Sequence, residues 1–166
     1  FGGGGSPLVL PGDYTVTMKA GTQELKRTVK IEMDPRITVS ATDLQDQLTA
    51  GLALRDMTSR INAMIQQADD LIGELQSTVA RGDASSARAK TLLDQAKDFR
   101  FRMGRLPGEQ GYRIQGRLRD DITALAGSTG NNPGPLTAGE KQRVGEVKAD
   151  LDKMNADWTA FMRTVR

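Results

Sequence analysis

The sequence predicts a mostly α-helical protein, an up-down bundle of about four helices preceded by a β-hairpin. Apolar and polar residues alternate with period two in residues 8–40, which is typical of strands. After residue 41 the apolar residues recur every three or four positions, which is typical of helices that pack together. We therefore divide the chain into a flexible glycine-rich linker at 1–7, a hairpin at 8–40 and a helical bundle at 41–166.

The linker opens with Phe1, four glycines and Ser6. Neither an initiator methionine nor a signal-peptide pattern stands at this end, so we expect an interior part of a longer polypeptide or a processed product. A glycine-rich run of this kind is flexible, whether it is natural or an added linker.

The hairpin is predicted from two alternating runs around a short turn. Residues 14–18 form the first run and residues 25–33 the second, with Gly21 between them. Arg27 is the one break in the apolar face of the second run. Asp34-Pro35 ends the strand, because proline has no N–H to donate to a partner strand.

A two-stranded hairpin is marginally stable in water, so its apolar face needs a cover. Three covers are open: one end of the bundle, preceding strands of a β-sandwich-like module that this hairpin completes, or another copy of the chain. A strand edge also offers free N–H and C=O groups to a strand from another molecule. The candidate strand-docking residues are Tyr14, Val16, Met18, Val29 and Ile31.

The first helix is predicted at 43–81. Thr42 and Gln45 fit a capping box at its start, and Arg81-Gly82 ends it. Its apolar stripe is predicted to face neighbouring helices. The stripe consists of Leu44, Leu48, Leu52, Leu54, Met57, Ile61, Met64, Ile65, Ala68, Ile72, Leu75 and Val79.

Two shorter helices are predicted next, at 84–105 and 110–126. Asp83 is the expected cap of the first, and Pro107-Gly108 separates the two. The stretch 127–135 is rich in glycine, asparagine and proline, so it is predicted to be a loop.

The last helix, predicted at 138–165, has the most regular pattern in the chain. Thr137 and Glu140 form a second capping box. The apolar residues alternate steps of three and four, which indicates a stripe packed against partner helices. They are Val144, Val147, Leu151, Met154, Trp158, Phe161 and Val165, and at this spacing we expect Trp158 and Phe161 to lie in the core.

The chain has no cysteine and no histidine. This excludes thiolate and imidazole catalysis, Cys/His zinc sites and disulfides. The paired carboxylates Asp69-Asp70, Asp120-Asp121 and Asp150/Asp152 are one or two positions apart, and such neighbours do not face each other on a helix. We therefore predict no enzyme activity, no catalytic residue, no metal site and no cofactor.

Basic residues are concentrated between positions 97 and 119. This segment contains seven arginines and lysines but only two acidic residues. Guanidinium groups bind phosphates and carboxylates in a bidentate way, so this zone is a candidate anion site. The opposite interpretation is that these arginines are solvated or pair with acidic neighbours. The candidate contacts are Arg100, Arg102, Arg105, Arg113, Arg117 and Arg119.

Several short motifs carry a resemblance to a known family. They are Leu10-Pro11-Gly12-Asp13-Tyr14-Thr15-Val16, then Gly21, Val29-Lys30-Ile31, Asp34-Pro35-Arg36, Asp43-Leu44-Gln45 and Leu54-Arg55-Asp56. Together they resemble the C-terminal region of bacterial exported sortilin-like β-propeller proteins with BNR repeats. In that family an immunoglobulin-like module and a helical tail follow the propeller. The resemblance implies an exported protein (periplasmic, cell-surface or extracellular).

Taken together, the sequence predicts a non-catalytic structural or interaction module, the C-terminal accessory region of such a larger protein, acting in docking or self-assembly. The expected partner is a protein or another copy. The net charge of +2 is too balanced to indicate nucleic acid, and no stretch is apolar enough to span a membrane. One alternative is an anion-binding module for nucleic acid, polysaccharide or lipid headgroups through 97–119. Another is a non-catalytic fragment of a glycosyl-hydrolase-like enzyme.

Overall fold

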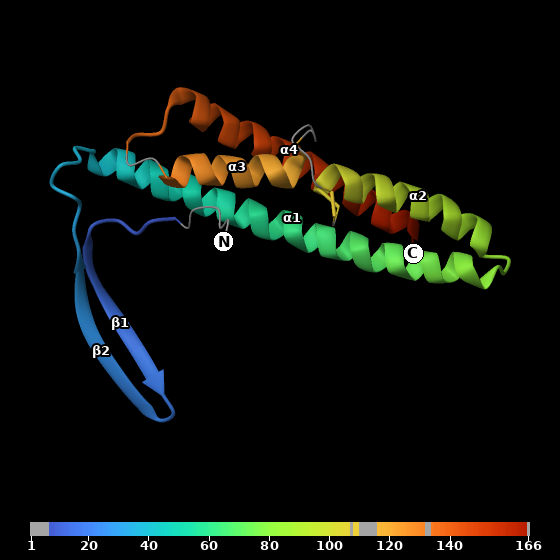
Figure 1. Cartoon of the computed structure of the whole chain (residues 1–166), viewed down its shortest axis with the longest axis horizontal. Helices are drawn as coiled ribbons and strands as arrows, with labels where there is room; N and C mark the ends of the chain where they lie inside the picture. Colours follow the sequence, from blue (N-terminus) through green and yellow to red (C-terminus); the bar gives the residue numbers. More distant parts are fainter. Residues whose placement is uncertain (1–6, 107, 110–115, 132–133, 166) are drawn as a thin grey trace.

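The computed structural model describes residues 7–106, 108–109, 116–131 and 134–165. A two-stranded antiparallel hairpin precedes four helices, and 67% of the described residues are helical (Figure 1). This confirms the predicted mostly helical class, with a hairpin in front of about four helices. The elements are β1 (Gly12–Ala20), β2 (Gln23–Ile31), α1 (Ala41–Arg81), α2 (Ser86–Met103), α3 (Leu118–Asn131) and α4 (Ala138–Val165). None of these helices is long and apolar enough to cross a membrane.

The helices form a long bundle built on α1. Helix α2 runs back along the C-terminal half of α1, α3 continues in the same direction along the N-terminal half, and α4 returns parallel to α1 (Figure 1). Side-chain pairs fix this arrangement, because Asp46 binds Lys141 near the start of both parallel helices and Gln67 binds Trp158 further along. Since α2 and α3 lie end to end, the bundle has three helices in cross-section.

The core follows the apolar stripes of all four helices. Its fully buried large side chains are Leu54, Ile61, Met103, Ile122, Val147 and Leu151. Phe99, Trp158 and Phe161 pack their rings together, with centroids 5.2–5.5 Å apart. Trp158 is 2% exposed and Phe161 8% exposed, which confirms that both belong to the core.

Helix α1 begins two residues earlier than predicted. The N-cap is Ser40 rather than Thr42, so the predicted capping box is wrong. Ser40 Oγ accepts a hydrogen bond from the Asp43 backbone N–H at 3.1 Å and donates to Asp43 Oδ2 at 2.6 Å. The positive end of the helix dipole also stabilises the negative charge of Asp43 in the first turn. A neutral glutamine would gain no such stabilisation.

Three other helix ends also differ from the prediction. The N-cap of α2 is Ser85, whereas Asp83 accepts from the Ser85 backbone N–H and side chain in the preceding turn. Helix α3 begins at Leu118 instead of 110, and residues 110–115 lie outside the described part of the chain. It also continues to Asn131, so the predicted loop at 127–135 is wrong over its first five positions.

The last helix matches its prediction at both ends. Helix α4 spans Ala138–Val165, and Thr137 and Glu140 form the predicted capping box. Glu140 N–H donates to Thr137 Oγ1 at 3.2 Å, and Thr137 N–H donates to Glu140 Oε2 at 2.9 Å.

The hairpin projects away from the bundle (Figure 1). Among the described elements, neither strand packs on a helix. The chain touches the bundle just before the hairpin, where Pro7 lies so close to Gly51 that an added Cβ at Gly51 would be 3.2 Å from Pro7 Cβ. Gly51 therefore allows the segment 7–10, which we call the strap, to lie against α1.

Candidate interaction surfaces

The apolar face of the hairpin is the first candidate surface. Antiparallel pairing sets Tyr14 opposite Val29, Val16 opposite Arg27 and Met18 opposite Leu25. Directly opposed residues share a face, so these six side chains lie together, as the period-two pattern predicts. Gly21, with φ +59°, makes the left-handed turn that joins the strands in this register.

The bundle does not cover this face. Val16 is 55% exposed, Met18 58% and Leu25 52%, and Tyr14 and Val29 are also exposed. The structure thus removes one of the three predicted covers and leaves the other two open. Ile31, at the foot of the hairpin, is the only one of the five candidate docking residues that is partly buried.

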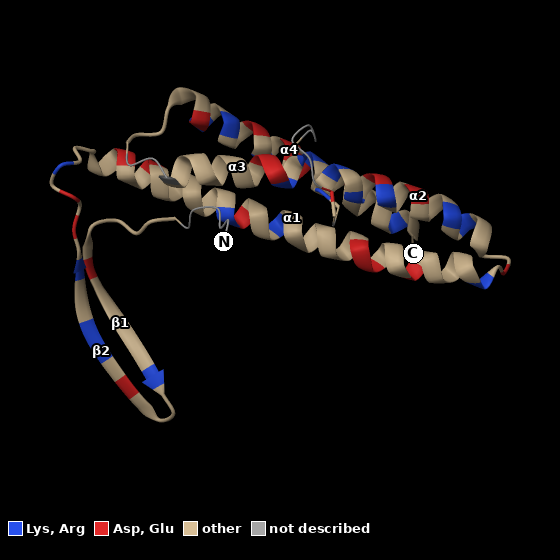
Figure 2. Ribbon diagram, in the orientation of Figure 1, with Lys and Arg blue, Asp and Glu red and all other residues tan. Residues whose placement is uncertain are grey.

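The other face of the hairpin is polar and internally paired. Lys26 and Lys19 both pair with Glu24, at 2.8 and 3.4 Å, and Lys30 pairs with Glu32 at 2.6 Å. Figure 2 shows these charges spread along the two strands. The hairpin therefore has one face suited to water and one face suited to another protein surface.

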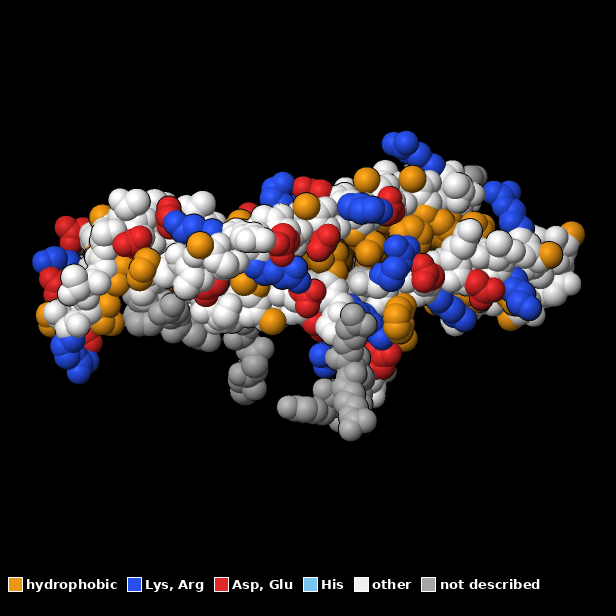
Figure 3. Space-filling view, turned by 90° about the horizontal axis from the view of Figure 1, so that it is seen from above, with side chains coloured by type: hydrophobic (Ala, Val, Ile, Leu, Met, Phe, Trp, Pro, Cys, Tyr) orange, Lys and Arg blue, Asp and Glu red, His pale blue; other side chains and the backbone are white. Residues whose placement is uncertain are grey.

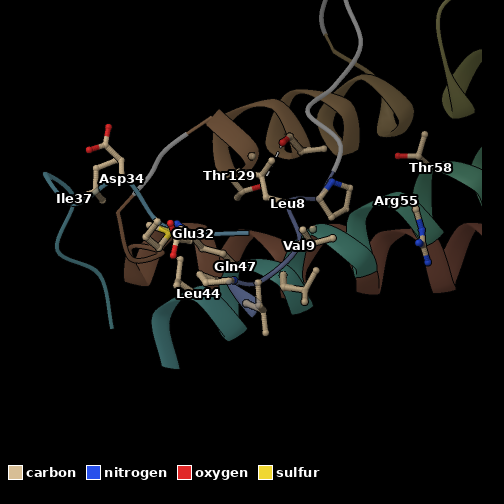
Figure 4. A pocket seen from close by; sticks show the side chains of 18 of the residues that line it. Leu8, Val9, Glu32, Asp34, Ile37, Leu44, Gln47, Arg55, Thr58 and Thr129 are labelled. Carbon is tan, nitrogen blue, oxygen red and sulfur yellow. Dashed lines mark hydrogen bonds between the residues drawn. The ribbon is translucent and has the colours of Figure 1, made fainter. Parts of the chain in front are cut away.

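A pocket lies at the foot of the hairpin, with a volume of about 650 Å³. It is bounded by the strap, the residues that follow β2, the start of α1 and the end of α3. Figure 4 shows Leu8 and Val9 of the strap among side chains of α1 and α3, with Asp34 at the end nearer the hairpin. The strap, the segment that follows β2 and the bundle all contribute residues to the wall of this pocket. Because the pocket lies between them, their side chains do not form one continuous core.

Local contacts hold the connections on either side of the hairpin. Tyr14 Oη donates to the Leu10 carbonyl at 2.8 Å before the first strand turns outward. After the second strand, Arg36 binds Asp34 with Nη2 2.6 Å from Oδ2, and this hydrogen bond lowers the pKa of the Asp34 carboxyl. Each connection thus has a hydrogen bond among its own residues next to the strands.

The arginine zone is the second candidate surface, and its centre is buried. Arg100 is 5% exposed, and its Nε lies 2.7 Å from Asp69 Oδ1. Its Nη1 donates to the carbonyl oxygens of Gly104 and Arg105, at 2.9 and 3.4 Å. Arg100 therefore binds carbonyl groups of the C-cap Gly104 and of the residue that follows it, just past the end of α2.

The other described arginines of this zone also have partners within the chain. Arg117 binds Glu109 at 2.7 Å and lies 3.6 Å above the Phe101 ring. Arg102 forms an ion pair with Asp98 and Arg105 forms one with Asp120. Arg119 donates a hydrogen bond to the side-chain oxygen of Asn62. Arg113 lies outside the described residues. These contacts link α2, α3 and α1, and Figure 3 shows basic and acidic side chains interleaved along the face it presents.

At least one carboxylate of each pair noted in the sequence enters an ion pair with another residue. Asp69 binds Arg100, Asp120 binds Arg105, and Asp121 binds Arg143 at 3.1 Å. Asp152 binds both Lys148 and Arg60, and these hydrogen bonds lower its pKa. Each of these carboxylates thus has a structural partner in the bundle.

Sequence reasoning missed Arg100 as a buried group and Leu8 and Val9 as exposed apolar residues. Arg100 continues the helical spacing of the buried residues Ala89, Leu93 and Ala96, which indicates a buried position. Its positive charge favours an exposed position instead, and the prediction from the sequence followed the charge. No local pattern marks the strap, because its position depends on the distant Gly51.

Neither a protein-family model, a curated protein nor a solved structure matches this chain. The resemblance to exported sortilin-like propeller proteins therefore stays a prediction from the sequence motifs.

Proposed function

We propose that this chain is a non-catalytic interaction module in which the bundle acts as a rigid support and the apolar face of the hairpin docks another protein surface. One observation carries the proposal: the apolar face projects, uncovered, from a bundle whose core is closed without it. Exposed apolar side chains grouped on one face are typical of protein contact sites.

The two free strand edges add a second means of contact. In the described part of the chain the sheet has only two strands, so each strand has an outer edge without a neighbour. A partner strand can pair with such an edge through its backbone while its side chains extend the apolar face. This supports docking or self-assembly over a passive role of the hairpin.

In this proposal the arginine zone has a structural task. Its five described arginines bind carboxylates, an amide or carbonyl groups of the same chain, so an anion would have to displace these contacts. We further propose, from the sequence resemblance alone, that the parent is a larger exported bacterial protein in which this chain is an accessory part.

The proposal is tested with two neighbouring substitutions that lie on opposite faces of β1. Val16→Glu places a charge on the apolar face, and Thr17→Glu places the same charge on the polar face. Binding of a labelled peptide that alternates valine and threonine is measured by fluorescence anisotropy, and self-association by sedimentation velocity.

We expect the whole chain to bind the peptide or to self-associate, and Val16→Glu to abolish this association while Thr17→Glu leaves it unchanged. The proposal fails if the chain shows neither association. Hairpin amides that then exchange hydrogen as fast as those of a free peptide would show in addition that the hairpin itself is not folded.

A further inference from the structure

The further inference concerns the chemistry of the docking partner and rests on the proposed function. Its starting point is Arg27, which stands in the middle of the apolar face. The strand register has nine pairs from Gly12↔Ile31 to Ala20↔Gln23, and Arg27 with Val16 forms the central one. Residues on either side of this pair on the same face are Tyr14, Val29, Met18 and Leu25.

Arg27 differs from the other cations of the hairpin in having no acidic partner among the described residues. The three lysines of the polar face each pair with a glutamate. Arg27 Nη1 instead donates to the backbone carbonyl of Lys26, at 2.8 Å, and no carboxylate of the described residues forms an ion pair with it. Its guanidinium thus has further N–H groups for an acceptor outside the chain.

Covering the apolar face would bring this guanidinium out of water. A buried charge without a counter-charge is strongly unfavourable, whereas a guanidinium bound by a carboxylate makes two parallel, charge-assisted hydrogen bonds. The most favourable cover is therefore apolar around its rim and acidic at its centre.

A second copy of the hairpin does not meet this requirement. The apolar face of the hairpin has no acidic residue. In the strand register Asp13 lies opposite Lys30 and Glu24 lies opposite Lys19, and both of these pairs belong to the polar face. Two hairpins stacked by a two-fold axis through the middle of the face would also bring both Arg27 residues into one row of the interface. Like charges in such a position oppose the pairing.

We propose that the occupant of the hairpin face is an amphipathic β-segment of another protein, with apolar side chains and a carboxylate in the centre that binds Arg27. Arg27 would select this partner and set its register, since only one alignment places the acidic residue over the guanidinium. The apolar side chains around it would provide the contact area.

The test uses the whole chain and two peptides of nine residues, the length of each strand. Both peptides alternate valine and threonine, and the central valine is replaced by aspartate in one and by lysine in the other. Their dissociation constants are compared by fluorescence anisotropy for the unchanged chain and for Arg27→Glu. Lys26→Glu is the matched control, because it changes the net charge equally on the adjacent residue of the polar face.

We expect the aspartate peptide to bind about tenfold more tightly than the lysine peptide, as one charge-assisted pair can provide. Arg27→Glu should reverse this preference, and Lys26→Glu should leave it within about twofold. Far-UV circular dichroism confirms that each variant keeps its helices.

Three other outcomes would each overturn the inference. Equal binding of both peptides, unaffected by Arg27→Glu, would leave the docking function intact but remove Arg27 as its selector. Self-association that persists in Arg27→Glu and excludes both peptides would show that a second copy covers the face. Failure of both peptides to bind a chain that also stays monomeric would remove the docking function itself.

Discussion

Arg100 shows how a charged residue can take a place in an apolar stripe. The buried residues of α2 are Ala89, Leu93, Ala96, Arg100 and Met103, and they follow helical steps of four and three. The aliphatic part of Arg100 therefore packs like its neighbours, while its guanidinium reaches Asp69 and the carbonyl groups that end the helix. This position is structural, because the chain itself supplies every partner described.

We expect Arg100→Ala to lower the free energy of unfolding by about 1–3 kcal/mol, since hydrogen bonds from a charged donor would be lost. Asp69 is half exposed and can return to water, which keeps the loss below that of a fully buried pair. Urea denaturation followed by the fluorescence of Trp158, the single tryptophan, measures the change. Lys97→Ala, an exposed change in the same helix, should stay below about 0.5 kcal/mol, and equal losses in both variants would contradict the prediction.

Glu109 links the junction between α2 and α3 to the pH of the solution. Hydrogen bonds from Arg117 first, and then from the Leu106 backbone N–H, hold the pKa of Glu109 below its usual value. Because the pKa is lower in the folded state, this contribution to stability is present above the unfolded pKa of about 4.3 and is lost as the pH falls through the folded pKa.

The midpoint of thermal unfolding should therefore decrease on acidification below about pH 4.3, and Glu109→Gln should remove part of that decrease. The exposed change Glu74→Gln controls for the loss of one carboxylate. Titration of the Glu109 carboxyl by NMR gives the direct measurement. A pKa at or above the ordinary value of about 4.3 would contradict the prediction.

At the scale of elements, the start of α1 shows which of two possible capping pairs forms. Ser40-x-x-Asp43 and Thr42-x-x-Gln45 both fit a capping box, and only the first one forms. We expect Ser40→Ala to destabilise the first turn by about 1 kcal/mol and Thr42→Ala by much less. Amide exchange of Leu44, whose N–H bonds to the Ser40 carbonyl, should become about fivefold faster in the first variant only. A larger effect of Thr42→Ala would mean that the helix starts where the sequence predicts.

The sequence predicts the type of each element better than its ends. Period-two alternation identifies the hairpin and its apolar face, and the stripe from Val144 to Val165 identifies α4 with its bounds. The loop predicted at 127–135 is wrong over 127–131, because packing outweighs the low helix propensity of glycine there. Thr129 is 5% exposed, continues the spacing of Ile122 and Leu125, and donates its hydroxyl to the Leu125 carbonyl at 2.9 Å.

At the scale of the whole molecule, the arrangement of helices depends on information that the stripes do not contain. A stripe shows which side of a helix is buried but not which helix covers it. Helix α1 is 41 residues long, about 61 Å at 1.5 Å per residue, and α2 and α3 share its length as two consecutive segments. Arginine contacts to Gly104 and Glu109 stabilise the described residues between these two helices, and no periodic pattern reveals such contacts.

The separation of hairpin and bundle leads to the last prediction: a chain that starts at Ser40 should fold as a helical bundle. Its core residues all lie after position 53, and the capping pair Ser40 and Asp43 is retained. The strap is lost, which exposes Leu44 and Leu48 more fully, so the midpoint of thermal unfolding should fall by only a few degrees. Far-UV circular dichroism and thermal unfolding of both chains give the comparison.

The same shortened chain should lose all binding of the strand peptides, because the apolar face is absent. If instead the shortened chain unfolds without cooperativity, the strap and hairpin are part of the folding unit and the bundle is not an independent support. If it keeps peptide binding, the docking surface lies on the helices, and the exposed face of the hairpin has another task. If the shortened chain unfolds cooperatively and no longer binds the peptides, the bundle is the support and the hairpin is the part that recognises the partner.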